Sequence, residues 1–485
     1  MGKLHKRRRG YSDEELDEEE EDFEDDEDVE EEDEDEEDDE IEDDEDEDYD
    51  DEAERRAYRH RRRIRNQIIV YLVILFVAAG IVAGGIVVGS KAASFVKQKR
   101  QAAEEKAKEE AAEQEEPEEE MVIDTPEPAE EEPGEEEDIL GELAESYYSE
   151  MSIENKVAGL FMVTPESITG VKTATKAGDG TQEALNQYAV GGLIYFGQNI
   201  LDKEQIMTML SNTASMSNYP IFLAVDEEGG EVSRVANSKV EVTKVDDMAS
   251  VGAGGDASLA ADAGTTIGSY LNEIGFNVDF APVADVAGEG SALGSRSFGS
   301  DPQAVGDMVS NAVGGIEGTG VSACLKHFPG LGSTSEDTHD GRVEITKSLD
   351  EMRASDFVPF SAGIEAGADF VMVSHATAPA LDEDNVPSSL SKKVITDILR
   401  GELGFEGIVI TDALDMTAIT DYYTPEEAAV MALEAGADML LMPEDFEKAY
   451  NAVLAAVQDG TISEERINES LDRIYRVKCA GKLEN

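Results

Sequence analysis

The sequence has few cysteines, few histidines and few basic residues. Its 485 residues include two cysteines, Cys324 within an apolar run and Cys479 near the C-terminus. This scarcity excludes a disulfide-dependent fold. Of five histidines, only His327, His339 and His375 lie beyond residue 145. They show no His-x-His or clustered ligand spacing, so a metal-dependent hydrolase has no support, and we expect no metal or other cofactor.

Basic residues are outnumbered by acidic ones, 39 to 111, which gives a net charge of -72. Residues 13–54 contain no Lys or Arg and consist almost entirely of Asp and Glu. Such a run repels itself and cannot bury apolar area, so residues 1–66 are predicted to be a disordered acidic tail. The tail either simply solvates the chain or docks cations or basic partners. No nucleic-acid partner is expected.

One long hydrophobic run is present, at residues 68–89. About 22 apolar residues suffice to cross a bilayer as a helix, so residues 67–90 are predicted to be a transmembrane helix. A cleaved signal peptide has its apolar core close to the N-terminus, which favours an uncleaved anchor here. The arginines at 55–65 outweigh the basic residues after the span, which predicts a cytoplasmic N-terminus and an extracellular remainder, with the protein at the cell membrane. A possible helix-mediated dimer is suggested by four glycines at small-xxx-small spacing, Gly80, Gly84, Gly85 and Gly89.

Residues 91–144 are acidic and rich in Glu, Ala and Pro, which predicts a charged, extended linker. The remaining residues, 145–485, have a length typical of a single (β/α)8 barrel of the TIM type. Eight short apolar runs alternate with helical patterns such as Val394–Leu403 and Pro425–Ala435, as expected for an α/β fold. An open doubly wound sheet gives a similar alternation, but no Gly-x-Gly-x-x-Gly follows the first strand, and the count favours a closed barrel. The predicted strands are Val157–Val163, Val190–Phe196, Ile221–Asp226, Asn277–Pro282, Val321–His327, Asp369–His375, Gly407–Asp412 and Ala437–Pro443.

Polar residues stand at or just past the ends of five predicted strands. In a barrel these ends form the catalytic face, and a carboxylate that ends an apolar strand has no packing reason to be there. The segment from Lys326 to His339 adds a dense group of cationic and titratable side chains, which points to catalysis rather than packing. The residues at the strand ends are Asp226, Asp285, Lys326, His327, His375 and Asp412.

Several motifs in this region resemble glycoside hydrolase family 3, in its β-N-acetylglucosaminidase (β-N-acetylhexosaminidase) branch. The resemblance covers about residues 150–480. It rests on Asp226-Glu227-Glu228-Gly229-Gly230 with Arg234, Phe280-Ala281-Pro282-Val283-Ala284-Asp285-Val286, Arg296-Ser297-Phe298-Gly299 with Asp301-Pro302, the Lys326–His339 stretch, and Gly404-Phe405-Glu406-Gly407 leading to Thr411-Asp412.

The resemblance implies roles for individual residues. Asp412 matches the nucleophile that forms a glycosyl-enzyme, as suits an ionised carboxylate. Asp337 and His339 match an Asp-x-His dyad in which the histidine is the acid/base, a role that suits a group titrating near neutrality. The terminal sugar would be held by Asp226, Arg234, Arg296, Lys326 and His327. Charge-assisted hydrogen bonds to sugar hydroxyls would orient it. The neighbouring Glu227, Glu228 and Glu231 are expected to be exposed loop charges.

Two features depart from the family pattern. Leu331 stands where a histidine is usual, and residues 287–293 before Arg296 lack the typical Asn and Pro. Both border the expected site, so we expect them to affect the leaving-group preference more than the reaction type.

Three interpretations remain open. The favoured one is a membrane-anchored, retaining exo-glycosidase that removes terminal β-linked N-acetylglucosamine from peptidoglycan fragments or other amino-sugar glycans. The second is a family 3 enzyme for a β-glucoside or β-xyloside, which we disfavour because the dyad is present and no second domain is expected. The third is a non-catalytic wall-binding protein of the same fold, which the intact Asp412, Asp337 and His339 argue against.

Overall fold

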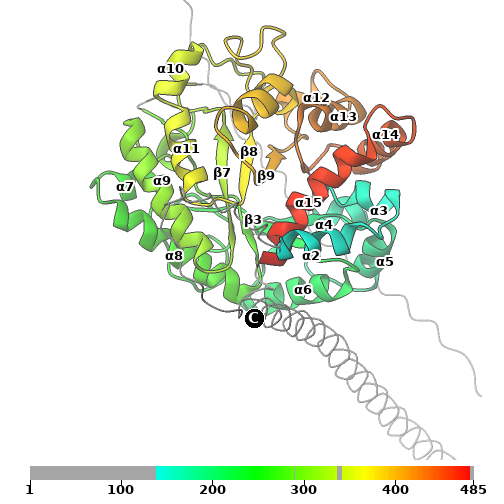
Figure 1. The fold of residues 1–485 in the computed structure, drawn as a ribbon. Coiled ribbons are helices and arrows are strands. Elements are labelled where there is room, and N and C mark those ends of the chain that lie inside the picture. The colour runs from blue at the N-terminus through cyan, green and yellow to red at the C-terminus, as the bar shows by residue number, and fades with distance from the viewer. Residues whose placement is uncertain (1–137, 289, 336–340, 481–485) are drawn as a thin grey trace, which may run out of the picture. The chain divides into compact units, whose positions relative to one another are not determined.

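The computed structural model describes residues 138–288, 290–335 and 341–480. In this part of the chain eight parallel strands form one sheet, in the order β10-β1-β2-β3-β6-β7-β8-β9 (Figure 1). The strands are β1 (Phe161–Val163), β2 (Gly192–Tyr195), β3 (Phe222–Val225), β6 (Val278–Asp279), β7 (Ser322–Phe328), β8 (Phe370–Val373), β9 (Ile408–Thr411) and β10 (Leu440–Leu441).

The two ends of this sheet approach each other. Ile410 on β9 forms a parallel bridge with Met439, which directly precedes β10. The amide of Thr411 also donates a hydrogen bond of 3.1 Å to the carbonyl oxygen of Met439. The sheet therefore curls into a TIM-type α/β barrel, as the sequence predicted.

The strands are short and apolar because the sheet is covered on both faces. Every residue of β2, β3, β8 and β9 is buried, as is typical of parallel strands between helices and a barrel interior. Each predicted strand region overlaps an observed strand, but β7 ends one residue later than predicted, at Phe328, and the first predicted strand begins four residues too early. Val157 belongs to helix α3 (Ile153–Ala158), which begins where the Ser152 side chain accepts a hydrogen bond from the amide of Asn155.

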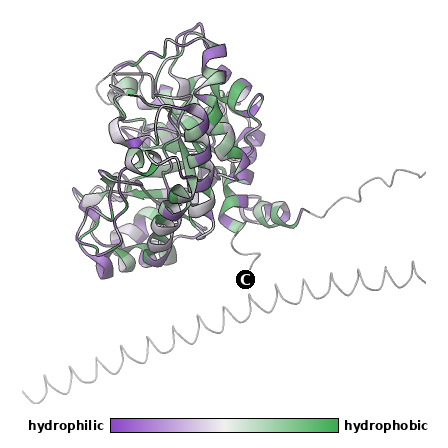
Figure 2. Cartoon of the chain, turned by 90° about the vertical axis from the view of Figure 1, so that its left-hand side faces the viewer, coloured by the Kyte–Doolittle hydropathy of each residue, from purple (hydrophilic) through white to green (hydrophobic). Residues whose placement is uncertain are grey.

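Helices surround the barrel, and Figure 2 shows that they carry both hydrophobic and hydrophilic residues. The α-helices besides α3 are α2 (Ile139–Tyr148), α4 (Pro165–Thr169), α5 (Asp179–Gln187), α6 (Lys203–Met216), α7 (Met248–Gly252), α8 (Ala257–Ile274), α9 (Pro302–Glu317), α10 (Leu349–Ala354), α11 (Phe357–Glu365), α12 (Thr417–Thr420), α13 (Pro425–Ala435), α14 (Phe446–Gln458) and α15 (Glu464–Ala480). The described residues also form three short 3-10 helices, η1 (Gly197–Asn199), η2 (Gly294–Arg296) and η3 (Ser388–Leu390), and one π-helix, η4 (Lys393–Arg400).

Local signals account for the helix that was predicted best. Helix α13 has the predicted bounds because Thr424 and Glu427 form a capping box at its start and Pro425 occupies its first turn. It ends at Gly436, whose φ of 113° favours glycine. The predicted helix Val394–Leu403 corresponds to η4, which begins one residue earlier and ends at Arg400.

The hydrophobic core fills the barrel interior and the layer between strands and helices. Phe222 and Phe370 are the first residues of β3 and β8, which are not neighbours in the sheet. Their rings nevertheless meet edge to face, with centroids 5.2 Å apart. Because both residues begin their strands, these rings meet at the N-terminal end of the barrel interior.

Two further features concern the N-terminal part of the chain. Helix α2 packs on α15, where the rings of Tyr147 and Tyr475 stack with centroids 5.4 Å apart, and the predicted domain boundary at residue 145 falls within α2. The predicted tail, transmembrane helix and nearly all of the predicted linker lie outside the described residues. Among the helices that are described, none is both long enough and apolar enough to cross a membrane.

Candidate active site

Charged side chains from the carboxyl ends of β3 and β7, which are separated in the sheet only by β6, meet at the mouth of the barrel. The Lys326 ammonium lies 2.8 Å from Oδ1 of Asp226 and 2.7 Å from Oε1 of Glu228. Lys326 is only 2% exposed. Burial by itself lowers the pKa of this amine, but the two carboxylates outweigh it and raise the pKa above its usual range. Lys326 is therefore a fixed cation within the site.

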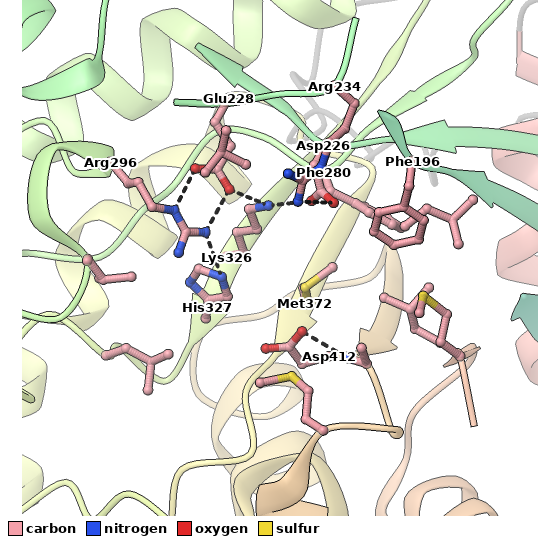
Figure 3. Close-up of a pocket in the computed structure, with 18 of the residues that line it drawn as sticks. Phe196, Asp226, Glu228, Arg234, Phe280, Arg296, Lys326, His327, Met372 and Asp412 are labelled. Carbon is pink, nitrogen blue, oxygen red and sulfur yellow. Dashed lines mark hydrogen bonds and ion pairs between the residues drawn. The ribbon is translucent and has the colours of Figure 1, made fainter. Parts of the chain in front are cut away.

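Glu228 lies in a hairpin that the sequence did not predict. It belongs to β4 (Glu227–Gly229), which pairs antiparallel with β5 (Val232–Ser233). Arg296 of η2 donates hydrogen bonds from Nε and Nη2 to its carboxylate, at 2.8 and 2.7 Å (Figure 3). Burial tends to raise the pKa of Glu228, but Lys326 and Arg296 lower it to about 2. This carboxylate is ionised at neutral pH.

The expectation that Glu227 and Glu228 are exposed loop charges was wrong. Both are buried, because the β4–β5 hairpin turns them inward, and only Glu231 is exposed as expected. Glu227 accepts hydrogen bonds from the amides of Val235 and Ala236, at 2.7 and 2.8 Å, and so braces the hairpin.

Asp285 orients His327. Its Oδ2 lies 2.8 Å from Nδ1 of the imidazole and also accepts the backbone amide of His327 at 3.0 Å. Its Oδ1 accepts the amide of Leu331 at 2.6 Å. The Nε2 atom is left on the pocket side, 3.4 Å from Nη2 of Arg296. Sequence reasoning placed Asp285 at a strand end but gave it no role, because its partners are 42 and 46 residues away.

Asp412 follows β9 and faces the same pocket from below Lys326 and His327 in Figure 3. Its Oδ1 accepts the amide of Ala413 at 2.8 Å. Burial tends to raise the pKa of Asp412, but the positive fields of His375 and His327, this amide and Lys326 lower the pKa below its usual value. The carboxylate is thus ionised at neutral pH, as a nucleophile or cation-stabilising group must be.

His375, at the end of the sixth predicted strand, is fully buried. Its Nδ1 lies 2.8 Å from Oγ of Ser389, and its Nε2 lies 2.8 Å from the carbonyl oxygen of Ala413. Both ring nitrogens are engaged, so His375 supports the loop that carries Asp412.

A cavity of about 300 Å³ at the C-terminal end of the barrel is lined by Asp226, Glu228, Arg296, Lys326, His327 and Asp412. Arg234 lies at one side, 3.6 Å from Oδ2 of Asp226 and over the ring of Phe196. The structure thus brings together all five predicted substrate-binding residues and the predicted nucleophile. Apolar side chains complete the wall, among them Phe196, Phe280, Leu293, Leu331, Met372, Met416 and Met442.

Two predicted site residues cannot be placed. Asp337 and His339 lie outside the described residues, so the dyad stays a prediction. The residues that depart from the family pattern can be placed, because Leu331, Ala292 and Leu293 all line the cavity. Within the described part of the chain, no group of three or more His, Cys, Asp or Glu residues could hold a metal ion.

An α/β barrel with an ionised carboxylate, fixed cations and an oriented histidine at the C-terminal end of its strands belongs to the TIM-type barrel enzymes. Residues 152–477 match the family model described as "Glycosyl hydrolase family 3 N terminal domain". Because this match covers more than half of the chain, the protein belongs to glycoside hydrolase family 3.

Curated relatives are beta-hexosaminidases. Beta-hexosaminidase A of Pseudoalteromonas piscicida is 33% identical over 327 residues, which are 61% of this chain and 54% of that protein. Beta-hexosaminidase of Stenotrophomonas maltophilia (strain R551-3) is 35% identical over 274 residues, which are 56% of this chain and 81% of that protein. The chain thus spans about half the length of the first relative and about four fifths of the second.

Solved structures agree with this. The glycoside hydrolase family 3 beta-N-acetylglucosaminidase from Paenibacillus sp. str. FPU-7 has a TM-score of 0.64 and 36% sequence identity, covering 69% of this chain and 64% of that chain. The beta-N-acetylhexosaminidase from Beutenbergia cavernae DSM 12333 has a TM-score of 0.60 and 28% identity, covering 68% of this chain and 98% of that chain. The family and branch predicted from the sequence are confirmed.

Proposed function

We propose that this protein is a retaining exo-glycosidase that releases terminal β-linked N-acetylglucosamine, with Asp412 as nucleophile. The observation that carries the proposal is the position of Asp412. Its ionised carboxylate lies at the end of β9 and lines the same small cavity as Lys326, His327 and Asp226. A cavity of about 300 Å³ suits one sugar ring rather than a length of chain, which favours attack at a glycan end.

The charged groups opposite Asp412 suit the hydroxyl groups of a sugar. Lys326 and Arg296 supply donors from fixed cations, and Asp226 supplies an acceptor. Arg234 also lines the cavity and places a further guanidinium 3.6 Å from Oδ2 of Asp226. Charged groups of this kind discriminate strongly against sugars that leave them unpaired.

Asp412 would attack the anomeric carbon and form a glycosyl-enzyme, which water then hydrolyses. A second group must protonate the leaving oxygen and later deprotonate that water. We assign this role to His339, with Asp337 as the partner that fixes its tautomer. Glu228 cannot serve, because its pKa of about 2 leaves it without a proton to donate at neutral pH. His375 cannot serve either, because Ser389 and Ala413 occupy its ring nitrogens.

The substrate class rests on the curated relatives, which are named beta-hexosaminidases, and on the similar solved structure, which is named a beta-N-acetylglucosaminidase. We further propose that residues 67–90 anchor the protein in the cell membrane with residues 145–485 outside. Amino-sugar glycans at that surface, peptidoglycan fragments in particular, would then be the substrates.

The proposal predicts the outcome of one assay. The purified protein should cleave a chromogenic β-N-acetylglucosaminide in preference to the matching β-glucoside and β-xyloside. Asp412→Asn should lower kcat/KM by a factor on the order of 10⁴ or more, because the transition state loses its carboxylate. Asp421→Asn is the matched control, since Asp421 is exposed and follows α12. Retention of more than about a tenth of the activity in the folded Asp412→Asn variant would remove Asp412 from this role.

A further inference from the structure

The buried carboxylate of Glu228 contacts two cationic side chains of the site. Glu228 is 3% exposed, and its two oxygens are taken up by two cationic side chains. Arg296 reaches it through Nε and Nη2, and Lys326 through Nζ at 2.7 Å. In Figure 3 the three side chains lie side by side along one wall of the cavity.

The hairpin is built so that this carboxylate reaches the wall. Successive side chains of a strand point to opposite sides, so Glu227 and Glu228 face different surroundings. Glu227 is held by the amides of Val235 and Ala236 and by the hydroxyl of Tyr270, which donates at 2.8 Å. With Glu227 anchored on one side, Glu228 is directed to Lys326 and Arg296 on the other.

The two cations need an anion between them. Both contact Oε1 of Glu228 at 2.7 Å, so their like charges lie close together in a site largely shielded from water. Like charges in such a site repel strongly unless an opposite charge compensates them. Lys326 has a second carboxylate partner in Asp226, whose other oxygen lies 3.6 Å from Arg234. Without Glu228, Lys326 would keep its ion pair with Asp226, whereas Arg296 would lose its two hydrogen bonds to Glu228.

Spare donors remain after these contacts. An ammonium has three N–H donors and a guanidinium five. Lys326 uses one on Asp226 and one on Glu228, which leaves one. Arg296 spends two on Glu228 and retains its Nη1 donors. Both residues line the cavity. The carboxylate of Glu228 therefore fixes the directions in which the remaining donors point.

We propose that Glu228 is a positioning residue for the sugar: it holds Lys326 and Arg296 so that their remaining N–H donors meet hydroxyl groups of the bound glycone. This deepens the proposed function and rests on it. Glu228 itself does not contact the reacting atoms.

The test uses Glu228→Gln, which keeps the shape of the side chain and removes its charge. Glu231→Gln is the matched control, because Glu231 is exposed in the turn of the same hairpin and loses the same charge. Both variants and the wild-type protein are assayed on a chromogenic β-N-acetylglucosaminide and on its 3-deoxy, 4-deoxy and 6-deoxy analogues.

For Glu228→Gln we expect kcat/KM on the parent substrate to fall about 100-fold, the loss of one to two charge-assisted hydrogen bonds. For at least one deoxy analogue, kcat/KM should fall much less between the wild-type protein and Glu228→Gln. That analogue lacks the hydroxyl group to which Lys326 or Arg296 would donate, so a displaced donor costs it little. Glu231→Gln should match the wild-type protein on every substrate. Glu228→Asp keeps the charge but is one methylene shorter, so it should fold and still lose activity on the parent substrate.

Three outcomes would overturn the proposal. If Glu228→Gln loses the same factor on the parent and on every deoxy analogue, Glu228 has only a structural role. If Glu228→Gln or Glu228→Asp behaves like Glu231→Gln, Lys326 and Arg296 need no such anchor. If the wild-type protein cleaves none of the glycosides, the proposed function itself fails, and this result is distinct because it requires no variant.

Discussion

The N-terminal side of the barrel holds two carboxyl groups whose titration should change the stability of the fold. Glu317 is the last residue of α9, and Asp369 directly precedes β8. Oε1 of Glu317 accepts the amides of Ala323 and Asp369, at 2.7 and 3.3 Å. Burial and then the negative charge of Asp369 raise the pKa of Glu317 to about 8. Burial also raises the pKa of Asp369.

The sign of the effect follows from proton binding. In the unfolded chain Glu317 loses its proton near its ordinary pKa of 4.5, whereas the folded protein retains it up to about pH 8. Between these values the folded state binds more protons, so the free energy of unfolding falls as the pH rises. One proton corresponds to about 1.4 kcal/mol per pH unit at most. Because the site is partly open to solvent, we expect a loss of about 2 kcal/mol between pH 5 and pH 8.

Urea unfolding of the wild-type protein and of Glu317→Gln, repeated at several pH values, measures this effect. The glutamine oxygen can still accept both amides but has no proton to lose. The variant should therefore gain about 2 kcal/mol relative to the wild-type protein as the pH rises from 5 to 8. Glu365→Gln is the matched control, since Glu365 is exposed at the end of α11. Stability curves of wild type and Glu317→Gln that run parallel across this range would refute the reasoning.

Two further predictions concern parts of the chain outside the described residues. His339→Ala should impair cleavage least for substrates with a good leaving group such as a nitrophenolate, and should remove the limb near neutrality from the pH profile of kcat/KM. Asp337→Asn should give a milder loss, and an unchanged leaving-group dependence in His339→Ala would assign the acid/base role elsewhere. Protease added to intact cells should release a folded, active barrel and leave the acidic tail protected; digestion of the tail would invert the predicted topology.

The sequence predicted the barrel well because the strands of a parallel sheet are marked by composition. Each of the eight runs is apolar and is flanked by segments with helical periodicity. A parallel sheet that is covered by helices on both faces needs apolar residues along its strands. Val157 was misassigned because it begins an apolar run that leads into β1, although the cap at Ser152 places it in α3. The β4–β5 hairpin was missed because it consists of two acidic residues, glycines and a two-residue strand, with no apolar alternation to mark it.

The predicted site residues share a property that made them visible. Asp226 and Asp412 directly follow apolar strands, and Lys326 lies near the carboxyl end of β7, where a barrel gathers its functional groups. Asp285 was given no role from the sequence because it acts by hydrogen bonding to His327 and to the amide of Leu331. These contacts depend on how two loops pack against each other in the fold. Gly332 marks this meeting, since a Cβ there would lie 2.0 Å from the carbonyl oxygen of Val286.

Glu227 and Glu228 show most directly why the remainder could not be predicted. They are adjacent, identical and both buried, yet burial raises the pKa of Glu227, whereas Lys326 and Arg296 lower that of Glu228. The difference lies in their partners. Glu227 meets two amides and a hydroxyl, which do not offset the cost of burying a charge, whereas Glu228 meets two full positive charges, which do. Both cations come from residues more than sixty positions further along the chain. The chemistry of Glu228 is therefore set by the fold, which brings β4, η2 and β7 together, and not by the acidic motif in which it stands.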